Sequence, residues 1–212
     1  MLLPQRDNPL FGKGFDDAYT VTASGHRFYY ARFQPSDILF EDIATGLSFG
    51  CRWLGALNCH LSIATHSTTM AYWALVCRKT SLPKVMQYED DEVDKIVRKE
   101  FAKALFFHDS EEYVTGDFPS PLKQFFNPLF EDYASYVRET IYLKYNAHYP
   151  YYKHVKEWDR KMLFAEAHRF LVGGVNAVRD EGTVAQTLGC SVQARDPQKS
   201  REEFRSMYLR LI

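Results

Sequence analysis

An adjacent histidine and aspartate, His108 and Asp109, follow a long apolar stretch and offer an imidazole nitrogen beside a carboxylate oxygen. Such a pair suits a divalent cation that accepts mixed nitrogen and oxygen ligands. By itself the pair is weak evidence, because His-Asp neighbours occur by chance in many proteins. An earlier histidine, His66, lies in a stretch of helical periodicity and is followed by Ser67-Thr68-Thr69. Together these residues indicate a metal site built from more than one helix.

Two further carboxylates stand close behind the pair, in the segment HDSEEYVTGDFPSPLK of residues 108–123. Glu112 lies one helical turn beyond Asp109 if the helix continues, where it could orient or deprotonate a water molecule. Asp117 follows Gly116 in a Gly-Asp turn. Glu111 is expected to face solvent.

The order of these residues resembles that of the HD-domain phosphohydrolases, in particular the bacterial 5'-deoxynucleotidases and their phage relatives, over about residues 37–172. The resemblance implies that a histidine, a His-Asp doublet and a later aspartate bind one metal inside a helical bundle. Transferred to this sequence, the ligands are His66, His108, Asp109 and Asp159. Asp132 is the alternative fourth ligand, since it also lies in a helical stretch.

The resemblance also implies residues that contact substrate. Relatives present an arginine to phosphate, and a ring or apolar side chain to the sugar and base, just after the first helix, and Arg52 and Trp53 occupy that place. Arginine suits phosphate because its planar fork donates two parallel hydrogen bonds. Lys123 is a further phosphate candidate. Asp117 would assist the leaving oxygen or hold a second ion.

A divalent cation in such a site lowers the pKa of bound water and neutralises phosphoryl charge, so hydrolysis needs no nucleophile from the protein. Two nitrogen and two oxygen ligands suit Zn, Mn, Co or Fe, with Mg as a candidate for a second site. The segments of residues 25–53 and 159–168 are most similar to the dATP triphosphohydrolases (DatZ type) of phages that use 2-aminoadenine in their DNA. That similarity implies conversion of dATP to deoxyadenosine and triphosphate, which depletes dATP.

Two other function classes stay open. One is a general 5'-deoxynucleotidase that acts on several deoxynucleoside monophosphates. The other is a non-catalytic, metal-stabilised helical regulatory module. The carboxylate of Glu112 close to the metal ligands argues against this class, because a structural site would not need it.

Apolar periodicity predicts the helices that must position these residues. We expect helices at about 37–49, capped by Ser36 or Asp37, around His66, at 91–107, at 128–145, at 153–171 and at 204–212. The inner face of the helix at 91–107 should carry Val93, Ile96, Val97, Phe101, Ala104 and Leu105. The predicted fold is an all-α HD-domain helical bundle. Its parts are a short irregular or hairpin arm at 1–36, the phosphohydrolase domain at 37–190, and a polar tail with a docking helix at 191–212.

Composition limits the partners of the 212-residue chain. Its net charge of -1 comes without a basic block, so no nucleic acid partner is expected. No apolar run approaches the roughly 18 residues of a membrane span, and the N-terminus lacks a leader pattern. Four cysteines without a CxxC pair predict free thiols and a cytoplasmic protein, in the host cytoplasm if phage-encoded. The aromatic content of 16% and the resemblance together predict a homo-oligomer, a dimer or hexamer.

Overall fold

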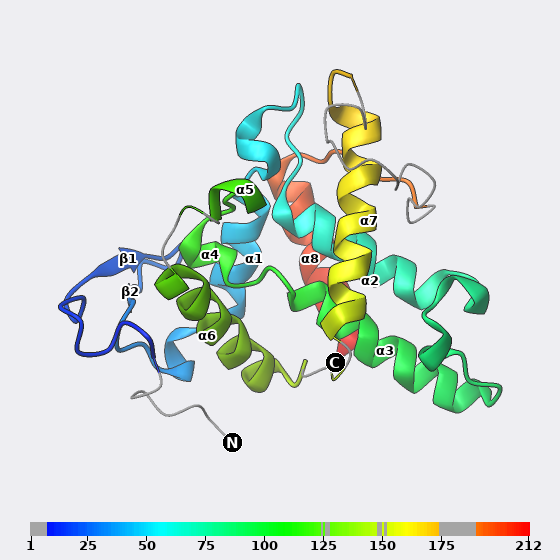
Figure 1. Cartoon of the computed structure of the whole chain (residues 1–212), viewed down its shortest axis with the longest axis horizontal. Coiled ribbons are helices and arrows are strands. Elements are labelled where there is room, and N and C mark those ends of the chain that lie inside the picture. The colour runs from blue at the N-terminus through cyan, green and yellow to red at the C-terminus, as the bar shows by residue number, and fades with distance from the viewer. Residues whose placement is uncertain (1–7, 124, 126–127, 148–149, 151, 174–189) are drawn as a thin grey trace.

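The chain folds as an all-α bundle with one small hairpin, as the sequence predicted (Figure 1). The computed structural model describes residues 8–123, 125, 128–147, 150, 152–173 and 190–212. In chain order its strands and helices are β1 (Tyr19–Val21), β2 (Arg27–Tyr29), α1 (Phe40–Phe49), α2 (Ile63–Val76), α3 (Asp91–Phe107), α4 (Glu112–Thr115), α5 (Ser120–Lys123), α6 (Pro128–Tyr145), α7 (Tyr152–Phe170) and α8 (Pro197–Leu211).

The N-terminal arm is a hairpin, with β1 and β2 antiparallel. Its anchor in the core is Phe28, which is fully buried and stacks on Phe33 with ring centroids 4.6 Å apart. The turn of the hairpin is held to α1 by Asp42, whose carboxylate accepts hydrogen bonds from Thr22 Oγ1 and from the backbone N–H of Ser24, each at 2.7 Å. The predicted arm is therefore docked on the bundle.

The first helix begins at Phe40, three residues later than predicted, and neither Ser36 nor Asp37 caps it. Its N-cap is Leu39, which offers no side-chain hydrogen bond. Asp37 instead accepts a hydrogen bond from the backbone N–H of Gln34 at 2.7 Å and closes a separate 3-10 turn. An acidic residue can close either kind of turn, so residue type alone did not locate the helix start.

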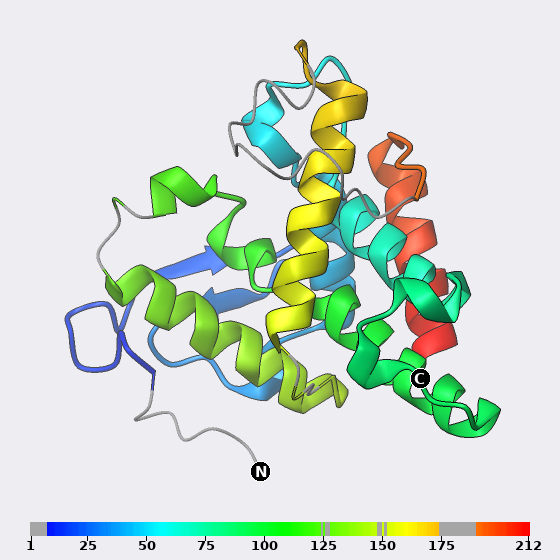
Figure 2. The same cartoon turned by 45° about the vertical axis from the view of Figure 1, so that its right-hand side comes forward.

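Helix α2 is the centre of the bundle and packs against α1, α3, α7 and α8. Helix α7 crosses α2 and α3 on one side, and α8 lies against α1 and α2 on another (Figure 2). Aromatic pairs join these layers. Phe101 of α3 meets Trp158 of α7 edge to face at 5.0 Å, and Phe106 of α3 stacks on Phe204 of α8 at 4.1 Å. Many of the aromatic side chains thus fill the core, where their large apolar area is buried.

Helix α3 spans its predicted range, but the first part of its predicted inner face is wrong. Phe101, Ala104 and Leu105 are fully buried, whereas Val93 is 37% exposed and Ile96 is 63% exposed. Helical periodicity identifies an apolar face but not how far neighbouring helices extend along it. The neighbours of α3 in the described part of the chain leave Val93 and Ile96 uncovered, although Asp94 between them is buried.

The C-terminal helix α8 docks as predicted but starts at Pro197, seven residues earlier than the sequence suggested. Asp196 caps it by accepting a hydrogen bond from the backbone N–H of Lys199 at 3.0 Å. Phe204 and Leu211 are buried against the bundle. The first two turns of α8 are polar, so apolar periodicity predicted only the second half of the helix.

Two expectations about the whole chain agree with the structure. The four cysteines are all free thiols. Among the helices that the structure describes, none combines the length and apolarity needed to cross a membrane.

Candidate metal centre

Four side chains from three helices converge at the middle of the bundle: His66, His108, Asp109 and Asp159. His66 lies on the second turn of α2, His108 and Asp109 end α3, and Asp159 lies midway along α7. Each offers one ligand atom, and these four atoms all lie within 4.8 Å of one another. These are the four residues that the sequence nominated.

Hydrogen bonds fix the orientation of both imidazole rings. Nδ1 of His66 lies 2.7 Å from Oε1 of Glu166, and Nδ1 of His108 lies 2.8 Å from the carbonyl oxygen of Leu105. Both partners are acceptors, so each Nδ1 carries a proton, and each Nε2 is the nitrogen that could offer a lone pair to a metal in place of its own proton. The two Nε2 atoms face each other at 3.3 Å. Metal-binding histidines usually have such a partner on the second nitrogen.

The carboxylates face the same space. Oδ1 of Asp159 lies 3.2 Å from Nε2 of His66, and Oδ2 of Asp109 lies 3.0 Å from Nε2 of His108. Burial alone would lower the pKa of His108, but the charges of Asp109 and Asp159 raise it to about 10. The cluster therefore requires positive charge, which a proton or a metal cation can supply.

The geometry suits a cation. Bonds of about 2.0–2.2 Å place two ligands of one ion at most roughly 4.4 Å apart, close to the separations present here. The side chains of His66 and His108 are 0% and 1% exposed, whereas those of Asp109 and Asp159 are 14% and 28% exposed. The imidazole side of the cluster is therefore closed, and its carboxylate side is open to solvent.

Glu166 links the metal cluster to the two predicted substrate residues that follow α1. Its Oε2 accepts hydrogen bonds from Nε of Arg52 at 3.0 Å and from Nε1 of Trp53 at 3.2 Å. Arg52 is buried, and its Nη1 lies 3.5 Å from Oδ2 of Asp109. Burial opposes the charge on Arg52, but Glu166 and Asp109 raise the pKa of its guanidinium. Arg52 and Trp53 are thus held at the edge of the cluster.

Glu112 and Lys123 form an ion pair beside the metal ligands. Nζ of Lys123 lies 3.0 Å from Oε1 of Glu112, which is only 5% exposed. The other carboxylate oxygen, Oε2, has no hydrogen-bond partner among the described residues. Burial, and after it the charges of Asp109 and Asp117, raise the pKa of Glu112 well above its usual range. A buried carboxylate with one unpartnered oxygen can handle a proton.

The chain turns back at Gly116 and brings Asp117 toward the cluster. Gly116 has φ 80°, a left-handed conformation that favours glycine and ends α4 after a single turn. Burial raises the pKa of Asp117, Arg52 lowers it and Asp109 raises it further, so these groups lie near one another. Asp117 is partly exposed and is available to a ligand.

Glu111 does not face solvent as the sequence suggested. It is 3% exposed and forms an ion pair with Arg138 of α6, which is itself 7% exposed. The turn between α3 and α4 directs Glu111 inward because the short α4 packs on α1, where Gly46 lets Tyr113 approach. A Cβ at Gly46 would lie 2.9 Å from the Cβ of Tyr113. The adjacent acidic residues Glu111 and Glu112 alone did not predict this close approach.

The fourth residue of the cluster is Asp159, not the alternative Asp132. Asp132 is exposed on α6 and takes no part in the cluster. Trp158, adjacent to Asp159, is buried against Phe101, and this contact fixes the rotation of α7. The carboxylate of Asp159 is thereby directed between the two histidines.

Two residues of α7 belong to the site although the sequence analysis did not nominate them. Glu166 lies seven residues, or two turns, after Asp159, and that spacing on one helix face was the available signal. Lys156 lies one turn before Asp159. Burial opposes its charge, but Tyr152 and Asp109 raise the pKa of its ammonium group, and its Nζ lies 5.4 Å from the centre of the Tyr152 ring.

Comparison with known proteins places few constraints on this site. No model of a known protein family matches the chain. Over 107 residues the chain is 32% identical to the uncharacterized protein YfdR of Escherichia coli (strain K12). The match covers 50% of this chain and 47% of YfdR, so the chain spans about half the length of this curated relative. Since YfdR is uncharacterized, the similarity carries no activity with it.

Proposed function

We propose that this protein is an HD-domain, metal-dependent nucleotide phosphohydrolase that converts dATP to deoxyadenosine and triphosphate. The observation that carries the proposal is the open cluster of His66, His108, Asp109 and Asp159, with further charged side chains beside it. When bound, a divalent cation would activate water and neutralise charge on phosphoryl oxygens. Zn, Mn, Co and Fe suit the two nitrogen and two oxygen donors.

Three basic side chains near the cluster support a phosphoryl substrate. Arg52 is held by Glu166, Lys123 by Glu112, and Lys156 projects from α7 next to Asp159. The guanidinium of Arg52 would donate to phosphoryl oxygens, and the two ammonium groups would balance their charge. Three cations match a triphosphate better than a monophosphate, which favours a triphosphohydrolase over a general 5'-deoxynucleotidase.

Two carboxylates are available for proton transfer. Glu112 is not one of the four clustered ligands, and its unpartnered oxygen can accept a proton from the attacking water. Asp117 lies at the partly exposed side and is suited to the leaving oxygen. A purely structural metal site would need neither, which argues against a non-catalytic regulatory module.

A product assay tests the proposal. Purified protein is supplied with each candidate metal and with panels of dNTPs and dNMPs, and the products are separated by chromatography. We expect dATP and water to give deoxyadenosine and tripolyphosphate directly, with ¹⁸O from labelled water in the tripolyphosphate. The bond between phosphorus and the 5'-oxygen breaks in that case. Orthophosphate from dNMPs would instead support the broad nucleotidase, and no hydrolysis with any metal would refute both.

Variants separate the metal site from general damage. His108→Ala and Asp109→Ala should each lose bound metal and hydrolysis together, because each removes one ligand. His168→Ala and Asp132→Ala change exposed residues of the same types on α7 and α6 and should retain both. Metal content that is the same in all four variants would refute the site.

We also propose a homo-oligomer, a dimer or hexamer. Val93 and Ile96 of α3 are exposed, and so is Val85 in the turn of residues 84–86, which contacts α3. Exposed apolar side chains of this kind are found at subunit interfaces. Light scattering at micromolar concentration should give a multiple of the chain mass, and Ile96→Glu should lower it. A monomer for the unmodified protein would refute the proposal.

A further inference from the structure

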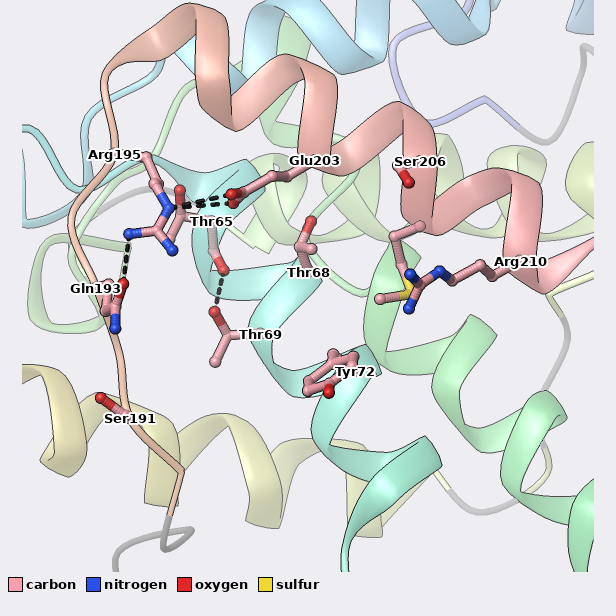
Figure 3. Close-up of a pocket in the computed structure, with 11 residues that line it drawn as sticks. Thr65, Thr68, Thr69, Tyr72, Ser191, Gln193, Arg195, Glu203, Ser206 and Arg210 are labelled. Carbon is pink, nitrogen blue, oxygen red and sulfur yellow. Dashed lines mark hydrogen bonds and ion pairs between the residues drawn. The ribbon is translucent and has the colours of Figure 1, made fainter.

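A pocket lined mainly by polar residues, none of them one of the four clustered ligands, lies between α2, the segment of residues 191–195 and α8 (Figure 3). Its volume is about 390 Å³. From α2 it is lined by residues that recur at helical spacing along one face: Thr65, Thr68, Thr69 and Tyr72. They include Thr68 and Thr69, which follow His66 in the sequence but take no part in the metal cluster.

The facing side of α8 is also polar. It contributes residues at the same i, i+3, i+4, i+7 spacing: Glu203, Ser206, Met207 and Arg210. Two helices that pack together normally turn apolar stripes toward each other. Here α2 and α8 are in contact, yet around the pocket both present hydroxyl and charged groups. The pocket is therefore suited to a polar ligand.

Two guanidinium groups give the pocket a positive character. Arg195 donates from Nε to Glu203 at 3.1 Å and from Nη1 to Gln193 at 2.7 Å. Arg210 forms no ion pair within the part of the chain that the structure describes, so one positive charge is uncompensated. Figure 3 shows the two arginines at opposite ends of the pocket, with the threonines of α2 between them. Glu203 and Arg210 are separated by about 10 Å along α8, from a rise of about 1.5 Å per residue.

A hydroxyl group between the arginines lacks a partner. Oγ1 of Thr68 is buried and forms no hydrogen bond with a described residue. Thr69, in contrast, donates to the carbonyl oxygen of Thr65 at 2.7 Å. Because the protein itself covers this oxygen, a ligand in the pocket would take its hydrogen bonds from the arginines instead.

We propose that this pocket binds a linear polyphosphate group, carried by a nucleotide or free as tripolyphosphate. Planar guanidinium groups at both ends match an elongated anion whose oxygens are all acceptors. The exposed ring of Tyr72 at the rim offers a stacking surface if the group belongs to a nucleotide. The site is separate from the metal centre but shares α2 with it, since Thr65 directly precedes His66.

Calorimetric titration of the metal-loaded protein tests this site, with inorganic tripolyphosphate and a non-hydrolysable dATP analogue as ligands. Arg210→Ala should weaken binding at the pocket by about tenfold or more, because it removes a charge-assisted donor. Thr68→Val, which keeps the side-chain shape, should leave the affinity unchanged, because Oγ1 of Thr68 is covered by the protein. The matched control is Arg205→Ala, which removes the same charge from α8 where Arg205 pairs with Glu41 at the surface.

Equal binding by the Arg210 and Arg205 variants, or no binding beyond the metal centre in the unmodified protein, would overturn the proposal. Asp109→Ala distinguishes it from the proposed hydrolysis, since it should abolish turnover but keep the binding that depends on Arg210. Loss of that binding in Asp109→Ala would assign the ligand to the metal centre and would also overturn the proposal. Tighter binding of the analogue, with the difference erased by Tyr72→Ala, identifies a nucleotide. Equal affinities identify free polyphosphate.

Discussion

Oε1 of Glu166 lies 2.7 Å from Nδ1 of His66, on the side of the ring opposite the metal cluster. The other oxygen of the same carboxylate accepts from Arg52 and Trp53. Glu166 is fully buried, so these contacts define its role. One carboxylate thus sets the orientation of a metal ligand and of two residues proposed to contact substrate.

Glu166→Gln should lower metal affinity by about 10–100-fold, the usual cost of changing an outer partner of a metal-binding histidine. The amide keeps the size of the side chain, but its NH₂ group must face either Nδ1–H of His66 or the donors of Arg52 and Trp53. Competition with a chromogenic chelator measures the change. Glu157→Gln is the control, because Glu157 is 51% exposed on α7 and pairs with His154 and Lys161, neither of which belongs to the cluster. Equal affinities in the two variants would mean that Glu166 does not support the metal.

The choice between two aspartates gives a second prediction. Asp159→Ala should reduce metal affinity by more than roughly 100-fold, since loss of a direct ligand exceeds the cost of an outer-shell change. Asp132→Ala should bind metal like the unmodified protein, because Asp132 is exposed on α6. Elemental analysis after dialysis measures both. Retention of metal by the Asp159 variant would show that the fourth ligand lies elsewhere.

A third prediction concerns the buried pair of Glu111 and Arg138. Arg138→Met should destabilise the fold by about 3–5 kcal/mol, because it leaves the carboxylate of Glu111 buried without its cation. The double variant Glu111→Gln with Arg138→Met should recover part of that loss. Arg205→Ala, which breaks the exposed pair with Glu41, should cost less than about 1 kcal/mol. Urea unfolding at one fixed metal concentration measures all three, and a single variant as stable as the double would contradict the reasoning.

The sequence predicted the helices best where apolar periodicity is long. It located α3, α6 and α7 within one or two residues, because each buries one face over several turns. It failed where polar residues decide the local structure. Asp37 closes a 3-10 turn instead of capping α1, and the polar first turns of α8 were read as a tail. Neither outcome depends on a repeating pattern.

The four clustered residues could be nominated because their order in the sequence resembles that of the HD-domain phosphohydrolases. The groups that support them could not, since their roles depend on how α7 rotates against α2. The places of Glu166 and Lys156 follow only from the packing of α7, which turns one face toward His66. The prediction that Glu111 faces solvent was wrong for a related reason, because the burial of Glu111 depends on how α4 packs against Gly46 of α1. Long-range contacts of this kind have no signal in local composition.

The last prediction separates catalysis from stability at Glu112. Glu112→Gln should keep the metal, because Glu112 is not among the four clustered ligands, yet slow turnover by about 10²–10⁴-fold if the carboxylate transfers the proton. Its stability should be unchanged or higher. The charge of Glu112 is buried near those of Asp109 and Asp117, which raise its pKa, so the native fold disfavours the ionised form that glutamine replaces.

Lys123→Met completes the test, because Lys123 contacts Glu112 and is also proposed to contact phosphate. If its main partner is the substrate, KM for dATP should rise more than kcat falls. If it serves only to hold Glu112, kcat should fall and KM should stay. Steady-state kinetics and thermal unfolding are measured together for both variants, with Glu157→Gln as the control. Normal turnover in Glu112→Gln would show that another group transfers the proton. Asp117, on the exposed side of the site, would then be the next candidate.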